Sequence, residues 1–260
     1  MATDELIYDI RDGIGHIVFN RPAARNAFTL AMYAELGDIC SGAPTDGSLK
    51  AIIMTGAGDK AFGSGTDMTQ FRGFSTPQDA WAYEQNMEQI LSRIERCPVP
   101  TIAAINGACT GGGAAIAACC DIRLATPNLK FGFPIARTLG NCLSVNNLRR
   151  LSDLLGKPLL REIMLTSRLV EAPEALAIGL VSEVAESTET LHVRAGKIAE
   201  RIAENAPLTL RATKEGLRRL GDASNVMDDR DLIELCYMSE DFKEGMEAFL
   251  AKRKPQWKGR

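Results

Sequence analysis

Two glycine-marked segments carry the residues whose types and spacing are best suited to chemistry. The first is Ala61–Asp67 (Ala-Phe-Gly-Ser-Gly-Thr-Asp), and the second is Asn106–Gly113, which ends in three consecutive glycines. Each follows a short apolar run, Ala51–Met54 or Thr101–Ile105, that predicts a buried strand. Glycine permits sharp turns and leaves backbone N–H groups uncovered. Two such turns at the ends of neighbouring strands would direct two N–H donors at one carbonyl oxygen that becomes an oxyanion.

A third glycine pattern, Gly56–Ala61, matches the turn of a dinucleotide-binding site, with alanine in the last position. That mechanism requires a helix to begin at once, so that its N-terminus meets a pyrophosphate. Gly63 and Gly65 follow instead and disfavour a helix there. No Gly-Lys-Ser/Thr sequence ends the run, which excludes a phosphate-binding loop.

The elements that must position these turns are strands and helices in alternation. The hydrophobic pattern predicts strands over Ile14–Phe19, Ala51–Met54, Thr101–Ile105, Asp121–Ala125 and Leu129–Phe133, and helices over Thr29–Ile39, Pro77–Arg96 and Gly111–Cys120. This order predicts right-handed crossovers and a largely parallel sheet. From about Leu143 onward the pattern is nearly all helical, with a break at Asn205–Pro207. A last helix begins at Ser239–Phe242, and a basic tail, Lys252–Lys258, follows it.

Length and composition set broad limits. The chain of 260 residues fits one large domain, or one domain with a smaller appendage. Its net charge of -3 disfavours a nucleic-acid partner, and no apolar run is long enough to span a bilayer. The acidic start, Met1–Glu5, lacks the order of a signal peptide. The seven cysteines show no metal-site spacing and are expected to be reduced thiols of a cytoplasmic protein without a metal, among them Cys40, Cys97 and Cys236.

The ordered set of motifs resembles the crotonase superfamily, also called enoyl-CoA hydratase/isomerase. The resemblance spans nearly the whole chain and rests on the two glycine-marked segments together with Asn20–Ala27, Cys120–Ala125, Ala175–Val181 and Ser239–Phe249. It implies an α/β fold with a crotonase-like spiral core of repeated strand–strand–helix turns, expected here over residues 1–195. It also implies a C-terminal helical oligomerisation region over residues 196–260 that builds homotrimers, often paired into hexamers. The ligand implied is a coenzyme A thioester as substrate, with no separate cofactor.

Residue roles follow from the same resemblance. Carried over by position, the two oxyanion-hole N–H groups belong to Ser64 and Gly112. Contacts with CoA are implied for Ala24, Arg25, Ser64, Gly65, Thr66, Asp67 and Met68, and for Phe249 and Lys252 toward the CoA of a neighbouring subunit. The alternative for Arg25 and Lys252 is a solvated surface charge, which is the usual state of such side chains.

The chain departs from this pattern at the two positions where hydratases of the family carry glutamates. One position, just after the three glycines, is Ala115, and the other, after Gly132-Phe133-Pro134, is Ile135. Neither side chain accepts a proton. Adding water across a double bond gains about 10²–10⁴-fold from a positioned acid or base. The hydratase mechanism in its usual form is therefore not expected.

The segment after Ile135 is unusually polar. One interpretation is an acyl pocket for a polar or carboxylated group, with Arg137 pairing its charge. The alternative is structural, with Ser144 or Asn141 capping the following helix. Cys142 is a weak candidate nucleophile, because no histidine lies in a motif near it to activate the thiol.

The long helix offers four polar side chains, Tyr83, Glu84, Gln85 and Glu88. Their expected place is a solvated helix face. The alternative is that one carboxylate faces the acyl chain and replaces the lost base.

These observations favour an acyl-CoA-processing enzyme that stabilises a thioester enolate in an oxyanion hole. One alternative is a malonyl-type acyl-CoA decarboxylase, in which the departing CO₂ supplies the electrons and no base is required. The other is a non-catalytic protein that binds CoA esters.

Overall fold

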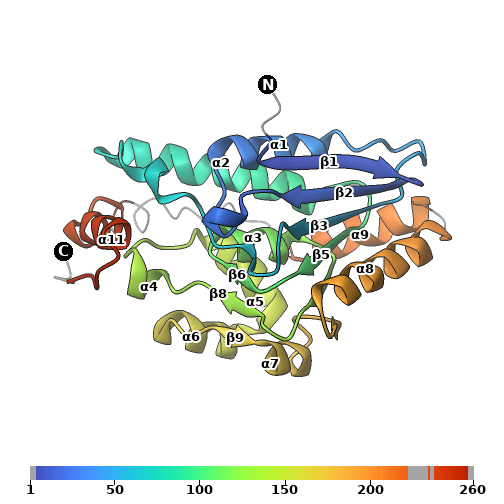
Figure 1. The fold of residues 1–260 in the computed structure, drawn as a ribbon. Helices are drawn as coiled ribbons and strands as arrows, with labels where there is room; N and C mark the ends of the chain where they lie inside the picture. Colours follow the sequence, from blue (N-terminus) through green and yellow to red (C-terminus); the bar gives the residue numbers. More distant parts are fainter. Residues whose placement is uncertain (1–3, 206, 222–233, 235–236, 257–260) are drawn as a thin grey trace.

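The computed structural model describes residues 4–205, 207–221, 234 and 237–256 (Figure 1). Cys236 lies outside these residues, and so does the part of the basic tail that follows Gln256. The strands are β1 (Leu6–Arg11), β2 (Ile14–Phe19), β3 (Ala51–Gly56), β4 (Ala61–Gly63), β5 (Thr101–Ile105), β6 (Ala108–Thr110), β7 (Ile122–Ala125), β8 (Lys130–Gly132), β9 (Val170–Glu171) and β10 (Glu183–Val184). The helices are η1 (Pro22–Ala24), α1 (Leu30–Ser41), η2 (Met68–Phe71), α2 (Pro77–Glu95), α3 (Gly112–Cys119), α4 (Ile135–Thr138), α5 (Val145–Leu155), α6 (Lys157–Thr166), α7 (Ala172–Ala177), α8 (Thr188–Ala203), α9 (Pro207–Gly221) and α11 (Glu240–Leu250).

The described strands form two sheets. The larger has the order β1-β2-β3-β5-β7-β10, and every neighbouring pair in it is parallel except β1 with β2. The smaller has the order β4-β6-β8-β9, with β9 antiparallel at its edge. The expected α/β class and largely parallel sheet are confirmed.

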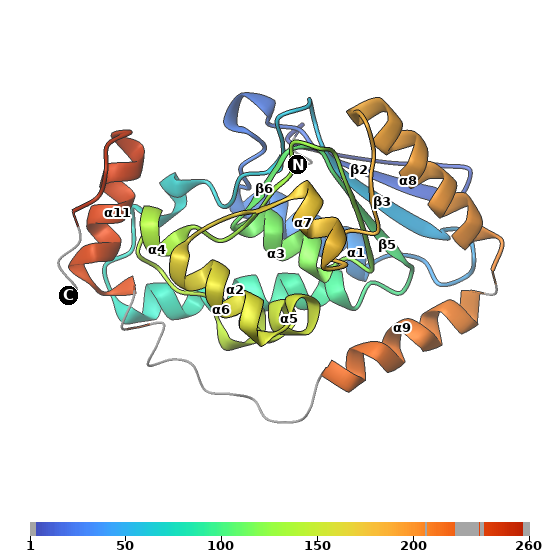
Figure 2. The same ribbon diagram turned by 90° about the horizontal axis from the view of Figure 1, so that it is seen from below.

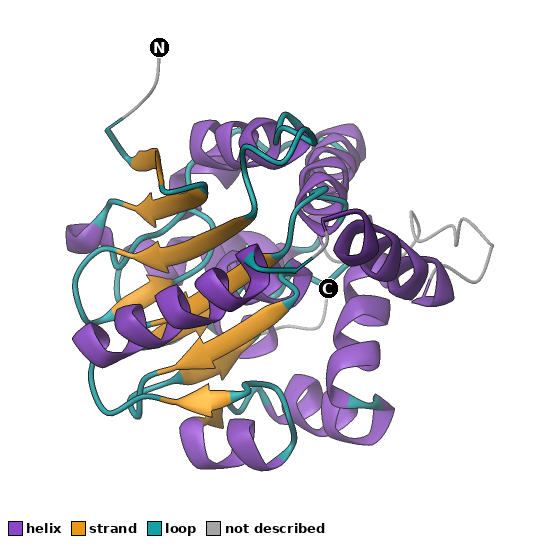
Figure 3. Ribbon diagram, turned by 90° about the vertical axis from the view of Figure 1, so that its right-hand side faces the viewer, coloured by secondary structure: helices purple, strands orange, loops and turns teal. Residues whose placement is uncertain are grey.

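Helices cover both faces of the large sheet, which explains why its central strands β3 and β5 are buried on both sides (Figure 3). Alternate residues of β3 point to opposite faces. Ile52 and Met54 belong to the main core, which includes residues of α1, α2 and α3. Ala51 and Ile53 pack in a second core on the other face, with residues of α8. All six residues of β3 are buried, as its sequence predicts.

Several short elements were not predicted from the hydrophobic pattern. Among the described residues after Leu143, the helical expectation is correct except for β9 and β10, which are two residues each. The three-residue strands β4 and β6 lie inside the glycine-marked segments, where the pattern predicts only turns. The expected domain boundary at residues 195 and 196 lies inside the continuous helix α8.

The end of the chain lies beside the middle of the chain. Helix α11 packs near α4 and η2, on the side of the molecule away from α8 (Figures 1 and 2). Ser239 caps α11 by accepting a hydrogen bond from the N–H of Phe242, as predicted. Phe242 and Tyr237 pack with Phe71 of η2 and Leu139 in a third apolar cluster. This cluster forms part of the wall of the candidate site.

Candidate active site

The two glycine-marked turns meet because the strands before them are neighbours. Strand β4 pairs with β6 in parallel, so their carboxyl ends lie at the same edge of the small sheet. The first turn continues into η2, which Asp67 caps by accepting from the N–H of Thr69. The second turn enters α3 directly, with Gly111 as its N-cap. The sequence prediction that the two turns lie together is therefore correct.

Close approach explains why glycine stands at the start of α3. A methyl group on Gly113 would collide with the carbonyl oxygen of Gly63. A methyl group on Gly112 would collide with the hydroxyl of Tyr33, which comes from α1. The same position lies 3.5 Å from the Thr66 hydroxyl oxygen, so the two turns and α1 converge at Gly112.

The backbone donors of the first turn differ from the expectation. The N–H of Ser64 donates to the carbonyl oxygen of Arg25 at 3.1 Å, and its hydroxyl donates to that of Ala24 at 3.3 Å. This N–H therefore does not point at a ligand. Among the residues that the structure describes, the N–H of Thr66 has no such acceptor. The N–H of Gly112 is the first of α3, where the helix itself supplies no acceptor.

The segment around Arg25 holds the first turn in place rather than lying in the cavity. Buried Asn26 donates to the carbonyl oxygens of Ala57 and Ala61 at 3.0 and 2.7 Å. Ala24 and Arg25 are exposed. Asp67 pairs with Arg21 at 3.0 Å. Burial raises the pKa of Asp67, but hydrogen bonds from Thr69 and the charge of Arg21 outweigh it and leave a net lowering.

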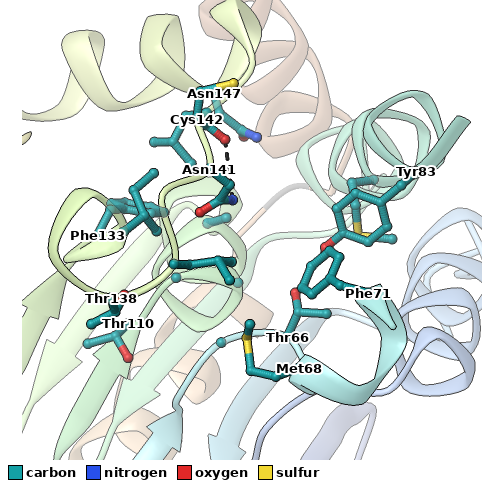
Figure 4. A pocket seen from close by; sticks show the side chains of 18 of the residues that line it. Thr66, Met68, Phe71, Tyr83, Thr110, Phe133, Thr138, Asn141, Cys142 and Asn147 are labelled. Atoms are coloured by element: carbon teal, nitrogen blue, oxygen red, sulfur yellow. Dashed lines mark hydrogen bonds between the residues drawn. The ribbon is translucent and has the colours of Figure 1, made fainter. Parts of the chain in front are cut away.

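A cavity opens directly beside the two turns (Figure 4). Its lining includes several predicted positions, namely Ser64, Gly65, Thr66, Met68, Gly112, Ala115, Ile135 and Phe249. Figure 4 shows two walls: one carries Thr66, Met68, Phe71 and Tyr83, and the other carries Phe133, Asn141 and Cys142. Ala115 and Ile135 present only apolar surface to the cavity, so neither position supplies an acid or a base.

Three hydroxyl groups form a chain along one wall. The Thr66 hydroxyl lies 3.0 Å from that of Tyr33 and 3.1 Å from that of Tyr83. Burial raises the pKa of both tyrosines well above the ordinary value for tyrosine, so both keep their protons. The chain fixes the Thr66 side chain beside Gly112 and thereby orients the first turn.

A buried carboxylate lies in the same cavity. Glu84 of α2 is only 7% exposed and accepts a hydrogen bond from the hydroxyl of Tyr237. The amide nitrogen of Asn141 contacts that hydroxyl at 3.5 Å. Burial is the main cause of a raised pKa for Tyr237, and the charge of Glu84 adds to it. The expected solvated helix face holds for Gln85 but is wrong for Glu84.

Glu88 has a different role, one turn further along α2. It accepts two hydrogen bonds from buried Arg150 of α5, at 2.6 and 2.8 Å. Glu95 accepts a third at 3.0 Å. These contacts fix α5 against α2, and residues of both helices line the cavity.

Other predicted residues lie elsewhere. Arg137 is exposed on α4 and is not among the residues that line the cavity, so the structure does not support a pairing with an acyl charge. Lys252 is also exposed. Phe249 lines the cavity of its own chain, whereas the resemblance implies contact with a neighbour's ligand. Ser144 caps α5 as predicted, by accepting from the N–H of Asn147 at 3.3 Å.

Nucleophilic and metal chemistry gain no support from the described residues. Cys142 lines the cavity, but the two histidines do not. His192 instead contacts the Thr55 hydroxyl at 3.3 Å, on the face of the large sheet that α8 covers. Within the described ranges, no three His, Cys, Asp or Glu side chains form a group that would hold a metal ion, and none of the helices is long and apolar enough to cross a membrane.

Sequence reasoning missed the contributions of Tyr33 and Tyr237. Tyr33 lies on a correctly predicted helix, yet nothing in the local pattern shows that its hydroxyl reaches Gly112. Tyr237 is distant from α2 in sequence, and only the packing of the C-terminal segment brings it to Glu84. Neither contact can be predicted from the sequence unless the three-dimensional arrangement of the helices is already known.

Comparison with known proteins gives matches over nearly the full chain. A family model described as enoyl-CoA hydratase/isomerase matches residues 9–260. The chain is 34% identical to a crotonyl-CoA hydratase of Syntrophomonas wolfei over 259 residues, covering 98% of both chains. It is also 34% identical to a solved enoyl-CoA hydratase/carnithine racemase of Magnetospirillum magneticum, with a TM-score of 0.79, covering 100% of this chain and 97% of the other.

A further solved structure is similar over its whole length. It is a methylmalonyl-CoA decarboxylase in complex with 2-nitronate-propionyl-CoA, and it is 28% identical to this chain. The TM-score is 0.88, and the match covers 100% of both chains. This likeness includes the C-terminal segment that contributes Tyr237 and Phe249.

Proposed function

Because this chain belongs to the enoyl-CoA hydratase/isomerase family, we propose that it binds an acyl-CoA thioester and stabilises the enolate form of its acyl group. The N–H groups of Thr66 and Gly112 are the proposed donors to the thioester oxygen. The observation that carries the proposal is the meeting of the two glycine-marked turns at one wall of a cavity, each with a backbone N–H that faces no acceptor of its own.

The chemistry follows from where charge develops. When the carbon next to the thioester carbonyl loses a proton or a carboxyl group, its electron pair moves onto the carbonyl oxygen. Two fixed N–H donors at this oxygen strengthen as the charge grows, and removal of one such donor typically costs about 10²–10³-fold in rate. The N-terminus of α3 adds roughly half a positive charge at the same place.

Binding of CoA itself is proposed along the open end of the cavity. Ser64, Gly65 and Met68 line the cavity, and Ser64 donates from its hydroxyl to the carbonyl oxygen of Ala24 and from its N–H to that of Arg25. Arg25 is an exposed cation and is proposed to meet the phosphate groups of this CoA, whereas Lys252, also exposed, is proposed to meet the CoA of a neighbouring subunit. No metal or second cofactor enters this proposal.

Hydration is not the proposed reaction, because Ala115 and Ile135 supply no proton acceptor. We expect turnover of crotonyl-CoA at least about 10²-fold below that of a hydratase assayed in parallel, the typical value of one positioned acid or base. A spectrophotometric assay of crotonyl-CoA hydration measures this. Turnover equal to that of the parallel hydratase would contradict the expectation.

A matched pair of variants tests the oxyanion hole. In a Tyr33→Phe background, which removes the colliding hydroxyl, Gly112→Pro deletes the N–H and Gly112→Ala keeps it. Proline is tolerated at the first position of a helix, so α3 is expected to form in both. The probe is 2-nitronate-propionyl-CoA, an anionic analogue of a thioester enolate, compared with propionyl-CoA by calorimetry.

The Gly112→Ala variant is expected to bind the nitronate at least about 10²-fold more tightly than propionyl-CoA, as analogues of reactive states do. The Gly112→Pro variant is expected to lose about 10²–10³-fold of that preference. Equal preference in both variants would show that the Gly112 N–H is not a donor to the enolate. Absence of binding of either ligand to the unmodified protein would reject an acyl-CoA enzyme altogether.

A second candidate is decarboxylation of a malonyl-type thioester, favoured by the full-length likeness to a methylmalonyl-CoA decarboxylase. This reaction needs an enolate site but no base to start it, which fits Ala115 and Ile135. Release of CO₂ from methylmalonyl-CoA would support it, and no release from a panel of malonyl-type thioesters would oppose it. Because Arg137 is exposed outside the cavity, Arg137→Ala is expected to leave any such activity unchanged.

A further inference from the structure

The cavity holds one carboxylate among its described lining residues, and it belongs to Glu84. The other titratable lining groups are tyrosines and one thiol, and burial raises the pKa of Tyr33, Tyr83 and Tyr237. These tyrosines therefore keep their protons and act as hydrogen-bond donors. Among these lining groups, a carboxylate is the one whose ordinary ionised form can accept a proton.

Glu84 also lies close to the proposed enolate site. Its neighbour Tyr83 contacts the Thr66 hydroxyl at 3.1 Å. Its charge contributes to the raised pKa of Tyr33, after the larger effect of burial, and the Tyr33 hydroxyl lies against Gly112. Glu84 thus lines the same cavity as Thr66 and Gly112, which carry the two proposed N–H donors.

The cluster around Glu84 places polar groups in a buried wall of the cavity. Burying a carboxylate is unfavourable unless strong partners compensate. The oxygen of the Asn141 side chain is buried and has no hydrogen-bond partner among the described residues, which costs about 1–3 kcal/mol. Apolar side chains in place of Glu84, Asn141 and Tyr237 would fill this wall with a smaller desolvation penalty. Asn141 lines the cavity, so this unmet acceptor lies where a bound molecule could supply its partner.

We propose that Glu84 is the acid–base residue of this pocket and that Tyr237 is its positioning residue. The inference rests on the proposed function, since it requires an acyl-CoA thioester at the Thr66 and Gly112 N–H groups. In the forward step the C–H bond next to the thioester carbonyl breaks and its proton passes to the Glu84 carboxylate. The electron pair forms the enolate double bond, and the carbonyl oxygen takes the negative charge. The reverse step returns a proton from Glu84 to the same carbon.

Tyr237 has a defined part in this arrangement. Its hydroxyl donates to one oxygen of Glu84, and the amide nitrogen of Asn141 lies 3.5 Å from that hydroxyl. A donated hydrogen bond favours the charged form of a carboxylate. Tyr237 therefore fixes the direction of the carboxylate through this hydrogen bond.

Exchange of the acyl α-protons for deuterium tests the proposal without requiring knowledge of the natural substrate. Butyryl-CoA is incubated with the full-length protein in D₂O, and deuterium at the carbon next to the carbonyl is followed by NMR. The key variant is Glu84→Gln, which keeps the size of the side chain and an oxygen for Tyr237. The matched control is Glu200→Gln, the same change at an exposed position of α8.

We expect Glu84→Gln to lower the exchange rate by about 10²–10⁴-fold, the usual value of a positioned acid or base. Butyryl-CoA affinity, measured by calorimetry, is expected to be unchanged, and Glu200→Gln is expected to exchange like the unmodified protein. In Glu84→Ala, added formate is expected to restore part of the exchange, because a small carboxylate enters the space left by the side chain. A residue with only a structural role would show no such rescue.

Tyr237→Phe provides a readout that packing alone would not move. The variant is expected to shift the pH–rate profile of exchange to higher pH, because the carboxylate loses a hydrogen bond that favours its charged form. An unshifted profile would remove Tyr237 from the proposal.

The outcomes separate this inference from the proposed function. Binding of butyryl-CoA with equal exchange in the unmodified protein and Glu84→Gln would overturn the role of Glu84 and leave the proposed function standing. Binding with no exchange by the unmodified protein would also overturn it. Absence of binding would instead reject the proposed function.

Discussion

At the scale of single residues, a shift of two positions along one turn changes which N–H group is available. The N–H of Ser64 donates to the carbonyl oxygen of Arg25, whereas the N–H of Thr66 has no acceptor among the described residues. Thr66 also links two tyrosines through its hydroxyl, so its backbone and its side chain have separate tasks. This separation makes them independently testable.

Replacing Thr66 by valine removes the hydroxyl and keeps the N–H. The Tyr33 hydroxyl, which is almost fully buried, then loses its partner, and we expect a loss of about 1–3 kcal/mol in the free energy of unfolding. Urea unfolding measures this, with Thr45→Val at an exposed position as the control. The preference for the nitronate over propionyl-CoA is expected to persist. Loss of that preference at unchanged stability would mean that the hydroxyl, rather than the N–H, meets the enolate.

The sequence predicts these residue roles unevenly. The meeting of the two turns could be predicted, because parallel strands bring their carboxyl ends to one edge. The identity of the free N–H could not, since it depends on a contact with the loop at Arg25 from another part of the chain. The burial of Glu84 could not be predicted either, because a polar residue on a long helix is exposed or buried according to what packs against it.

At the scale of elements, the position of α2 decides the shape of the cavity. It carries Tyr83 and Glu84 on one side and is fixed to α5 through Glu88 and Arg150. Its first turn is closed by a capping box between Thr76 and Asp79. The sequence predicts this helix to within one residue at its end, because two prolines follow and apolar residues recur at helical spacing. Strands β4 and β6 were not predicted because they lie inside the glycine-marked segments, whose glycines favour turns.

Removing the ion pairs between Arg150 of α5 and the carboxylates of α2 is expected to destabilise the packing of these two helices. Arg150→Met leaves the carboxylates of Glu88 and Glu95 without their buried cation. We expect a loss of about 2–3 kcal/mol in the free energy of unfolding, near the lower end for a broken buried pair because both carboxylates keep some exposure. The control is Arg253→Met, whose exposed pair with Glu244 is expected to contribute less than about 1 kcal/mol. Equal effects of the two changes in urea unfolding would contradict this role of Arg150.

The packing of α8 on the large sheet makes stability depend on pH. Burial is the main cause of a lowered pKa for both His16 of β2 and His192 of α8. The unfolded chain therefore binds protons on these side chains more readily than the folded chain does. Their contribution to stability is complete above the ordinary histidine pKa of about 6.5 and falls as the pH drops below it.

The expected measurement compares urea unfolding at pH 7.5 and at pH 5.5 for the unmodified protein and for a variant with His16→Gln and His192→Gln. The double variant is expected to lose less stability on acidification. Contributions from carboxylates are common to both proteins and cancel in the comparison. A larger loss in the double variant would show the opposite sign and reject the interpretation.

At the scale of the whole molecule, the chain folds its C-terminal segment back over its own cavity. Tyr237 and Phe249 come from this segment, and Phe242 and Met246 seal it against the rest of the protein. The resemblance predicts the fold class correctly, because motifs along the full length carry it. The boundary it implies does not coincide with an element end, since α8 continues across residues 195 and 196.

We expect the protein to assemble as a homotrimer or as a pair of trimers. Large apolar side chains such as Leu165, Val193 and Leu217 are 84%, 57% and 65% exposed in the single chain, as expected of surfaces that a neighbouring subunit covers. Size-exclusion chromatography with light scattering measures the mass, and a monomer at micromolar concentration would contradict the expectation. Leu165→Asp, Val193→Asp and Leu217→Asp then identify which of these surfaces lies in the interface.

The late position of Tyr237 and Phe249 also orders events during synthesis on the ribosome. All described strands of the two sheets have emerged once Val184 has been made, whereas the cavity wall still lacks these two side chains. A nascent chain stopped between these points is expected to hold its strands paired while its acyl pocket stands open on one side. Such a chain would resist proteolysis in its sheets yet show no ability to retain a thioester. Competence to bind ligand would therefore arise as one of the last steps in making the molecule.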